Sequence, residues 1–371
     1  MNLIPVNQPL LNGNERKYLN ECLDTGWISS EGPFVKKFEA LFAQKVDRKY
    51  GIAVCNGSAA LEAALQVLDF ERGAEIILPS FTIISCLSAI VRAGCTPVFV
   101  DSVPVTWNMD CNQIEKKITS KTKAIMVVHI YGLPTDMDHV LRLSAKYNLK
   151  IIEDAAEGHG LNYKNKPVGS FGDISTFSFY SNKHVTTGEG GMVLTNDANL
   201  AGRLYSIRNL CFQPAQRFVH EELGYNFRMT NIQAAIGVAQ VEQLDNFIKK
   251  KKEMGKYYIS QLENIEQIQL PQVSTDYAEN IFWVFGILIK NNCPFSAKEI
   301  MSSLRELGID TRPFFYPLHL QPALRKLNIK SDESLPVAEN LAEKGFYIPS
   351  GLGLSLEQME IVCKRVKQVF E

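Results

Sequence analysis

The stretch that organises the chain reads Ser175-Thr-Phe-Ser-Phe-Tyr-Ser-Asn-Lys-His-Val-Thr-Thr-Gly-Glu-Gly-Gly191. It places one lysine, Lys183, in a polar, glycine-rich loop between two apolar runs. Large apolar side chains alternate with small hydroxyl residues before the loop, and residues 191–195 after it have the composition of a second strand. A lysine between two strands is most often only solvated. A special role for Lys183 therefore depends on whether other parts of the chain supply the groups that it would need.

Length, composition and charge describe a large globular protein. The chain has 371 residues, of which 46% are hydrophobic and 21% are charged, so we expect two domains and a large buried core. The formal net charge of −1 provides no overall attraction to nucleic acid or to an acidic membrane. The lysine run at 249–252 is typical of the solvated face of a helix. We therefore expect neither a nucleic-acid partner nor a membrane partner.

The cysteines and the N-terminus indicate a cytoplasmic protein. Eight cysteines are scattered without a Cys-x-x-Cys pair, whereas a metal site or a disulfide framework would need clustering. The first ten residues have neither the basic head nor the long apolar segment of a signal peptide. The strongest apolar run, Ile281–Ile289, is too short to cross a bilayer. We expect free thiols in a reducing compartment and no bound metal.

Strands and helices alternate over the first part of the sequence. Apolar runs predict strands at 50–55, 75–78, 96–100, 124–129 and 149–152, and helical periodicity predicts helices at 59–68, 79–92 and 136–147. This alternation predicts an α/β fold with a mostly parallel sheet that is covered on both faces. In such sheets, ligands bind beyond the carboxyl ends of the strands.

A smaller α/β domain is predicted at the C-terminal end. The composition changes after a helix at about 247–262, so we place the boundary near residue 245, with a large domain at 13–245 and a small domain at 246–371. In the small domain we expect strands at 281–289 and 309–312, and helices at 296–307 and 357–370. Residues 1–12 contain two prolines and are expected to form an extended arm.

Three candidate ligand groups follow predicted strands. Asn56-Gly57-Ser58 joins a strand to a helix, and the free N–H groups of a helix start suit a phosphate, although an ordinary helix start is the commoner explanation. Asp154 ends a strand before two alanines, where it can hold a protonated ring nitrogen or simply cap a helix. Phe81 can lie on a flat ring or belong to the core.

Lys183 completes this set of groups. An uncharged lysine amine attacks carbonyl groups to form a Schiff base. The glycines at 188, 190 and 191 let the backbone approach a ligand closely, and Ser178 can offer its hydroxyl to a phosphate. A phosphate cup, a carboxylate for a pyridine nitrogen, a stacking aromatic and a lysine are together the parts of a pyridoxal 5′-phosphate site. The sequence has neither a Gly-x-Gly-x-x-Gly motif nor a P-loop lysine, so it supports neither a Rossmann dinucleotide site nor an NTPase.

These motifs carry a resemblance that extends nearly end to end. The segments are Gly26-Trp-Ile-Ser-Ser30, Asn56-Gly-Ser-Ala-Ala-Leu61, Pro79-Ser-Phe-Thr82, Glu153-Asp-Ala-Ala-Glu157, Phe177-Ser-Phe-Tyr180 with Lys183, Thr186-Thr-Gly-Glu-Gly-Gly191 and Gly224-Tyr-Asn-Phe-Arg-Met-Thr-Asn231. In them the chain resembles the nucleotide-sugar aminotransferases of the DegT/DnrJ/EryC1/StrS family, which have the aspartate-aminotransferase fold (fold type I). It looks most similar to members that use glutamate to aminate C4 of GDP-4-keto-6-deoxymannose for surface polysaccharide, and residues 311–319 are similar to theirs as well.

The resemblance implies a role for each site residue. Lys183 is expected to form a Schiff base with the cofactor and to carry the proton between the cofactor and the substrate carbon. Asp154 is expected to pair with the ring nitrogen, Glu157 to contact the ring hydroxyl (many relatives have glutamine there) and Phe81 to stack on the ring. The phosphate is expected to be bound by Gly57, Ser58 and Ser178.

The resemblance also implies a second subunit. Asn226 is expected to bind the phosphate in the partner subunit's site, so the active unit is expected to be a homodimer with shared active sites. Candidate residues for the sugar nucleotide or for the carboxylate of the amino donor are Arg228, Tyr316 and His319.

Three alternatives stay open at this point. One is a UDP- or dTDP-linked keto-sugar as substrate, with amination at C4 or C3. Another is sugar dehydration, as in the related dehydratases. These enzymes replace the lysine by histidine, so Lys183 favours transamination. The last is a regulator on the same scaffold, which would tolerate the loss of Lys183 or Asp154, and both are present. His184, where relatives often have Asn or Thr, has no assigned function.

Overall fold

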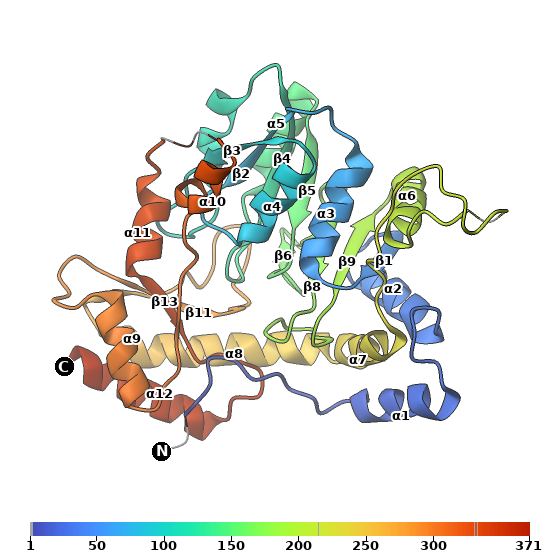
Figure 1. Cartoon of the computed structure of the whole chain (residues 1–371). Coiled ribbons are helices and arrows are strands. Elements are labelled where there is room, and N and C mark those ends of the chain that lie inside the picture. The colour runs from blue at the N-terminus through green and yellow to red at the C-terminus, as the bar shows by residue number, and fades with distance from the viewer. Residues whose placement is uncertain (1–2, 214, 330, 332) are drawn as a thin grey trace.

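The structure, a computed structural model, describes residues 3–213, 215–329, 331 and 333–371 (Figure 1). Its centre is a seven-stranded sheet in the order β1-β9-β8-β5-β4-β2-β3. These strands are β1 (Tyr50–Val54), β2 (Glu75–Pro79), β3 (Thr96–Val100), β4 (Thr122–Val128), β5 (Lys150–Asp154), β8 (Ile174–Ser178) and β9 (Gly191–Thr195). Neighbouring strands are parallel except at β9, which is antiparallel to both β1 and β8. The predicted α/β fold with a mostly parallel sheet is confirmed.

Helices cover both faces of this sheet. One face carries α3 (Gly57–Leu68), α4 (Ile84–Arg92) and α6 (Ala198–Arg208), and the other carries α2 (Pro33–Lys45), α5 (Met137–Tyr147) and α7 (Asn231–Glu242), with α1 (Glu15–Thr25) packed on α7. Side chains alternate between the two cores along each strand. In β1, Ile52 and Val54 belong to the core beneath α3, whereas Ala53 belongs to the core beneath α2.

Short polar side chains start the helices that follow the strands. The Asn56 side chain accepts a hydrogen bond from Ala59 N at 2.8 Å and so begins α3 directly after β1. Asp136 and Asp197 cap α5 and α6 in the same way. Thr230 begins α7 in a capping box with Gln233. These caps satisfy N–H groups that have no partner within the helix, so the polar turns fix where each helix begins.

A four-stranded antiparallel sheet forms the centre of the C-terminal part. Its order is β10-β11-β13-β12, with β10 (Ile268–Gln269), β11 (Phe285–Ile289), β13 (Gly345–Ile348) and β12 (Arg312–Pro313). The helices here are α9 (Ala297–Glu306), α10 (Pro322–Lys326), α11 (Pro336–Lys344) and α12 (Leu356–Phe370). The strand predicted at 281–289 begins only at Phe285. The strand predicted at 309–312 shrinks to Arg312–Pro313, because Ile309 pairs instead with Ile4 of the N-terminal arm.

The long helix α8 (Leu244–Leu262) runs horizontally below the large sheet in Figure 1 and leads from α7 to the C-terminal part. It begins one residue before the predicted boundary at 245, and the division into two domains stays a prediction. The N-terminal arm lies along the C-terminal part, where Ser350 N donates to Val6 O at 3.1 Å and Gly353 N donates to Gln8 O at 2.8 Å. Asn7 also donates to Ser181 O at 3.1 Å, which ties the arm to the lysine loop.

Short elements complete the fold. They are the hairpin β6 (Asn162–Tyr163) and β7 (Lys166–Pro167) and the 3₁₀ turns η1 (Cys111–Gln113), η2 (Glu115–Lys117) and η3 (Leu318–Leu320). Near the hairpin, the buried Glu153 carboxylate accepts hydrogen bonds from the backbone N–H groups of Gly169, Phe171 and Gly172.

Within the described ranges, no helix combines the length and the apolar character needed to cross a membrane.

Candidate active site

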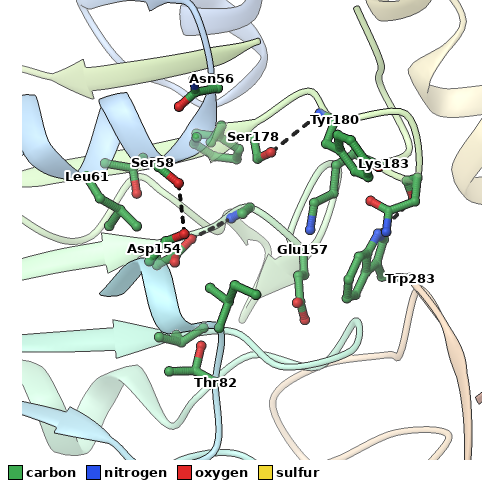
Figure 2. Close-up of a pocket in the computed structure, with 18 of the residues that line it drawn as sticks. Asn56, Ser58, Leu61, Thr82, Asp154, Glu157, Ser178, Tyr180, Lys183 and Trp283 are labelled. Atoms are coloured by element: carbon green, nitrogen blue, oxygen red, sulfur yellow. Dashed lines mark hydrogen bonds between the residues drawn. The ribbon is translucent and has the colours of Figure 1, made fainter. Parts of the chain in front are cut away.

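A cavity of about 560 Å³ opens at the carboxyl end of the large sheet. The last residues of the adjacent strands β4, β5 and β8, which are Val128, Asp154 and Ser178, all line it. This is the location expected for a ligand in a parallel α/β sheet. The structure therefore brings together six predicted site residues: Gly57, Ser58, Asp154, Glu157, Ser178 and Lys183. Figure 2 labels the last five of them.

One end of the cavity is a cup at the start of α3. The side chain of Asn56 uses its cap bond on Ala59, so the N–H groups of Gly57 and Ser58 lie in the first helical turn without a partner inside the helix. A Cβ atom on Gly57 would lie 2.7 Å from the Cβ of Ser178. Only glycine therefore lets the helix start approach β8 this closely. Such a helix start favours an anion such as phosphate.

The middle of the cavity is bounded by Asp154. Its side chain is buried, and its two carboxylate oxygens accept one hydrogen bond each from the protein. Ala156 N donates to Oδ1 and Cys86 Sγ donates to Oδ2, both at 3.1 Å. Ala156 also lines the cavity, and its small side chain leaves room for a flat ring in front of the carboxylate.

Glu157 and Lys183 are both buried, and the charge of each affects the pKa of the other. Burial raises the pKa of Glu157 to about 8, which the Lys183 charge opposes. Burial lowers the pKa of Lys183 below its ordinary value, which the charges of Glu157 and Asp154 oppose. One Glu157 oxygen also accepts a hydrogen bond from Tyr131 N at 2.8 Å. The lysine amine therefore loses its proton more readily than a solvated lysine, as a nucleophile requires.

Trp283 forms the wall beside Lys183, a contact that could not be predicted from the sequence. Lys183 Nζ lies 3.7 Å from the centroid of the indole ring, and Figure 2 shows the lysine pointing between Glu157 and Trp283. The indole N–H donates to Asn182 O at 3.0 Å, which fixes the ring. An ammonium over an aromatic face is attracted by the ring quadrupole, so Trp283 stabilises the charged amine when it is free.

His184, which had no assigned function, is a buried part of the lysine loop. Its Nδ1 lies 3.4 Å from His159 O, and Val185 N donates to His159 Nδ1 at 3.2 Å. Burial lowers the pKa of His159 to about 3 and that of His184 well below its ordinary value. Both rings are therefore neutral at physiological pH. They join the lysine loop to the segment that follows Asp154, so His184 positions the loop.

The structure corrects the prediction for Phe81. Its side chain is fully buried and does not line the cavity, and its ring packs at centroid distances of 5.7–6.0 Å against Tyr131, Phe314 and Phe315. The chain turns directly after β2, so that Ile83, two residues later, lines the cavity and remains 41% exposed. Phe81 therefore belongs to the core, which was the other possibility for it in the sequence, and Ile83 offers an apolar side chain to the cavity.

The candidate substrate residues do not line the cavity of their own chain. His319 is buried, with Nδ1 2.6 Å from Ser80 Oγ and Nε2 3.2 Å from Glu339 Oε1. Both ring nitrogens of His319 therefore have partners inside the protein, which does not support a substrate contact in this arrangement, and the substrate role of His319 stays a prediction. Arg228 Nη1 donates to Asn209 Oδ1 at 2.6 Å, and Tyr316 is exposed. Their roles stay predictions.

The cavity fits pyridoxal phosphate at each end. A Cβ on Gly191 would lie 2.3 Å from Asn56 O, so a glycine is needed where β9 passes the backbone of the cup. Asn182 Oδ1 is buried in the wall without a hydrogen-bond partner among the described residues. Asp154 offers an anion to a ring nitrogen, and Lys183 offers an amine to an aldehyde. Within the described parts of the chain, His, Cys, Asp and Glu side chains form no group of three or more that could hold a metal ion.

Comparison with known proteins identifies the family. Residues 9–367 match the DegT/DnrJ/EryC1/StrS aminotransferase family. The chain belongs to this family. It is 44% identical over 370 residues to the GDP-perosamine synthase of Escherichia coli O157:H7, which covers 100% of this chain and 99% of that protein. It is 37% identical to the dTDP-3-amino-3,6-dideoxy-alpha-D-galactopyranose transaminase of Aneurinibacillus thermoaerophilus, with 94% of this chain and 93% of that protein covered.

A solved structure supports the same assignment. DesV of S. venezuelae is 33% identical, covers 96% of this chain and 94% of its own, and superposes with a TM-score of 0.88. The predicted family, the fold class and the prediction of an aminotransferase are thereby confirmed. The roles of the individual site residues follow from the geometry above and stay predictions.

Glu157→Gln is expected to remove a pH-dependent loss of stability from the cofactor-free protein. The pKa of Glu157 is about 8 in the folded chain and 4.5 ordinarily, so between these values the folded chain binds a proton that the unfolded chain has released. Wild-type stability therefore falls as pH rises toward about 8. The variant should gain up to about 1.4 kcal/mol per pH unit on the wild type between about pH 6 and pH 8 in urea unfolding. A difference that stays constant with pH would contradict this assignment.

Proposed function

We propose that the protein aminates C4 of GDP-4-keto-6-deoxymannose to GDP-perosamine, with pyridoxal 5′-phosphate as cofactor and glutamate as amino donor. The observation that carries this proposal is one lysine with a lowered pKa, Lys183, in a cavity that also holds Asp154 and the cup at Gly57. The full-length similarity to a GDP-perosamine synthase supports the substrate. The product would serve the synthesis of O-antigen or another surface polysaccharide. The free cysteines of the chain fit a cytoplasmic location.

The proposed roles follow from where each side chain lies. The start of α3 binds the cofactor phosphate through the N–H groups of Gly57 and Ser58, helped by the hydroxyl of Ser178. Asp154 holds a proton on the ring nitrogen, and Ile83 covers one face of the ring. The cofactor, once bound, supplies an electron-withdrawing ring that accepts the charge developing on the reacting carbon.

Lys183 and Glu157 are proposed to control the protons of the reaction. Lys183 Nζ would hold the cofactor covalently through its aldehyde carbon and, once free, would carry a proton between the cofactor and the substrate carbon. Glu157 holds its proton at neutral pH because its pKa is raised to about 8. It can therefore donate a hydrogen bond to the ring hydroxyl, as a glutamine amide would.

A homodimer with shared sites is also part of the proposal. Asn226 is exposed and does not line the cavity of its own chain. It lies in the irregular segment between α6 and α7, which also presents exposed apolar side chains: Phe218 is 80% and Leu223 is 95% exposed. Large apolar side chains that are this exposed suit burial against a partner. In a dimer, Asn226 would complete the phosphate site of the partner subunit.

The alternative substrate is a dTDP- or UDP-linked keto-sugar. One observation favours it, because the family also includes a dTDP-sugar transaminase that is 37% identical to this chain. A sugar dehydratase is disfavoured, since the expected exchange of the lysine for histidine has not occurred at position 183.

Product analysis on a panel of substrates tests the proposed function. Purified enzyme is supplied with glutamate and with GDP-, UDP- or dTDP-linked 4-keto-6-deoxy sugars, and the products are identified by mass spectrometry and NMR. We expect one amino group at C4 of the GDP-sugar, with transfer from ¹⁵N-glutamate, and far slower turnover of the other two. Amination of only a UDP- or dTDP-sugar would overturn the substrate and leave the reaction class intact. Loss of hydroxyl without amination would indicate a dehydratase.

A further inference from the structure

A thiol hydrogen-bonds the carboxylate at the centre of the site. Cys86 lies in the first turn of α4, and its Sγ is 3.1 Å from Asp154 Oδ2. Both side chains are buried, at 0% and 2% exposure. Thr82 Oγ1 lies 3.9 Å from the same sulfur, so the carboxylate is the closer partner. Because an ionised carboxylate can only accept, the thiol must be the donor.

The protonation state of Cys86 agrees with this direction. Burial, together with the negative charge of Asp154, raises the pKa of Cys86 well above its ordinary value. The thiol therefore keeps its proton at any pH at which the enzyme would work. Since Ala156 N already donates to Oδ1, the protein supplies one donor to each oxygen, and the remaining lone pairs are left for the cavity.

The strength of the second donor matters for the charge of the carboxylate. A thiol is a weak hydrogen-bond donor, whereas a hydroxyl donates strongly to an ionised oxygen. A strong donor at Oδ2 would draw charge away from the ring nitrogen. An apolar side chain there would leave more charge for the ring nitrogen, but it would leave the buried Oδ2 atom without a partner, which destabilises the folded protein.

We propose that Cys86 is a positioning residue that sets how firmly Asp154 holds a proton on the nitrogen of the cofactor ring. This rests on the proposed function, because it requires the ring nitrogen to face Asp154. The weak S–H donor holds the carboxylate in place and leaves most of its negative charge for the ring nitrogen. The competing explanation is that Cys86 only fills space between α4 and the sheet.

A series of three variants separates these explanations. Cys86→Ser substitutes a strong donor of similar shape, and Cys86→Ala removes the donor. Cys111→Ser is the matched control, because Cys111 is also a buried thiol, but its Sγ donates to the backbone carbonyls of Met109 at 3.7 Å and Asp136 at 3.8 Å and not to the Asp154 carboxylate. Unfolding in urea shows whether each variant is folded and how much stability it has lost.

The deciding measurement is the ¹⁵N chemical shift of ring-labelled pyridoxal phosphate bound to each variant, followed against pH. We expect the ring nitrogen to lose its proton about one pH unit earlier in Cys86→Ser than in the wild type, and later in Cys86→Ala. Cys111→Ser should titrate like the wild type. The kcat should follow the same order, with an unchanged KM for glutamate.

Two failures are distinguishable in this experiment. If the wild type does not bind the labelled cofactor at all, the proposed function is wrong. If the wild type binds it and all variants titrate alike, with only their unfolding midpoints changed, Cys86 is a packing residue and the inference is overturned. A titration order opposite to the predicted one also overturns it.

Discussion

Replacing Lys183 by alanine is expected to lower turnover by at least about a thousandfold, because it removes both the nucleophile and the carrier of the proton. Transfer of ¹⁵N from glutamate to the nucleotide sugar measures this loss. Cofactor binding should persist through the phosphate cup and Asp154, although without a covalent link. Unchanged turnover in Lys183→Ala would refute the mechanism.

The matched control for Lys183 is another buried lysine. Burial also lowers the pKa of Lys251, to about 7, so a depressed pKa alone does not identify the nucleophile. Lys251 does not line the cavity, and its amine donates hydrogen bonds to the carbonyl oxygens of Ser350 and Trp283. Borohydride reduction of the cofactor-loaded wild type, followed by peptide mass mapping, should label Lys183. A label on Lys251 would contradict the assignment.

The Lys183→Ala variant also tests whether the two subunits share their active sites. Lys183→Ala and Asn226→Asp chains are each expected to have little activity, the second because a carboxylate would repel the partner's phosphate. If the sites are shared, a mixed dimer has one site with both defects and one site with neither. Refolding the two variants together should then restore activity that neither variant has alone. No recovery, with mixed dimers demonstrated by mass spectrometry, would place Asn226 outside the partner's site.

The strand ends of the large sheet could be predicted because one physical rule governs them. Apolar runs at 50–55, 124–129 and 149–152 predicted β1, β4 and β5, and the alternation of large apolar and small hydroxyl residues before the lysine loop predicted β8. Parallel strands end at a common edge. Gly57, Asp154 and Ser178 therefore had to lie close together once each was placed at a strand end. Lys183 joined them because its loop follows β8 directly.

Side-chain direction inside a turn could not be predicted in the same way. The segment after β2 contains Phe81 and Ile83, and an aromatic ring was the more plausible cover for a flat ligand. A tight turn, in which Thr82 N donates to Ser80 O at 3.2 Å, sends Phe81 into the core and Ile83 to the cavity. Both outcomes satisfy the same hydrophobic pattern, so only the backbone geometry decides between them.

Contacts between distant segments were also invisible in the sequence. Trp283 lies 100 positions after Lys183 and meets it because the chain bends at Phe282, which has a φ of +48°. A Cβ on Gly132 would lie 2.8 Å from Trp283 N, so this glycine lets the bend approach the large sheet. The strand predicted at 281–289 did not include this bend, and for that reason Trp283 was not recognised as part of the cavity wall.

Replacing Asp154 by asparagine is expected to be the second most damaging change. The amide keeps the shape of the side chain but removes the negative charge that holds a proton on the ring nitrogen. We expect kcat to fall about 10²- to 10³-fold and the Kd for the cofactor to rise about tenfold, measured by steady-state kinetics and by quenching of tryptophan fluorescence. Asp197→Asn, at the cap of α6 away from the cavity, is the control that should leave both unchanged.

A cofactor analogue makes the electrostatic role of Asp154 testable apart from any loss of shape. Pyridoxal phosphate methylated on its ring nitrogen carries a permanent positive charge, so it does not need a carboxylate to hold a proton there. With Asp154→Asn this analogue should restore part of the lost turnover, whereas with the wild type it should bring no gain. If the analogue fails to help a variant that binds it, the loss arises from altered geometry and not from charge. Asp154 would then orient the ring without controlling its proton.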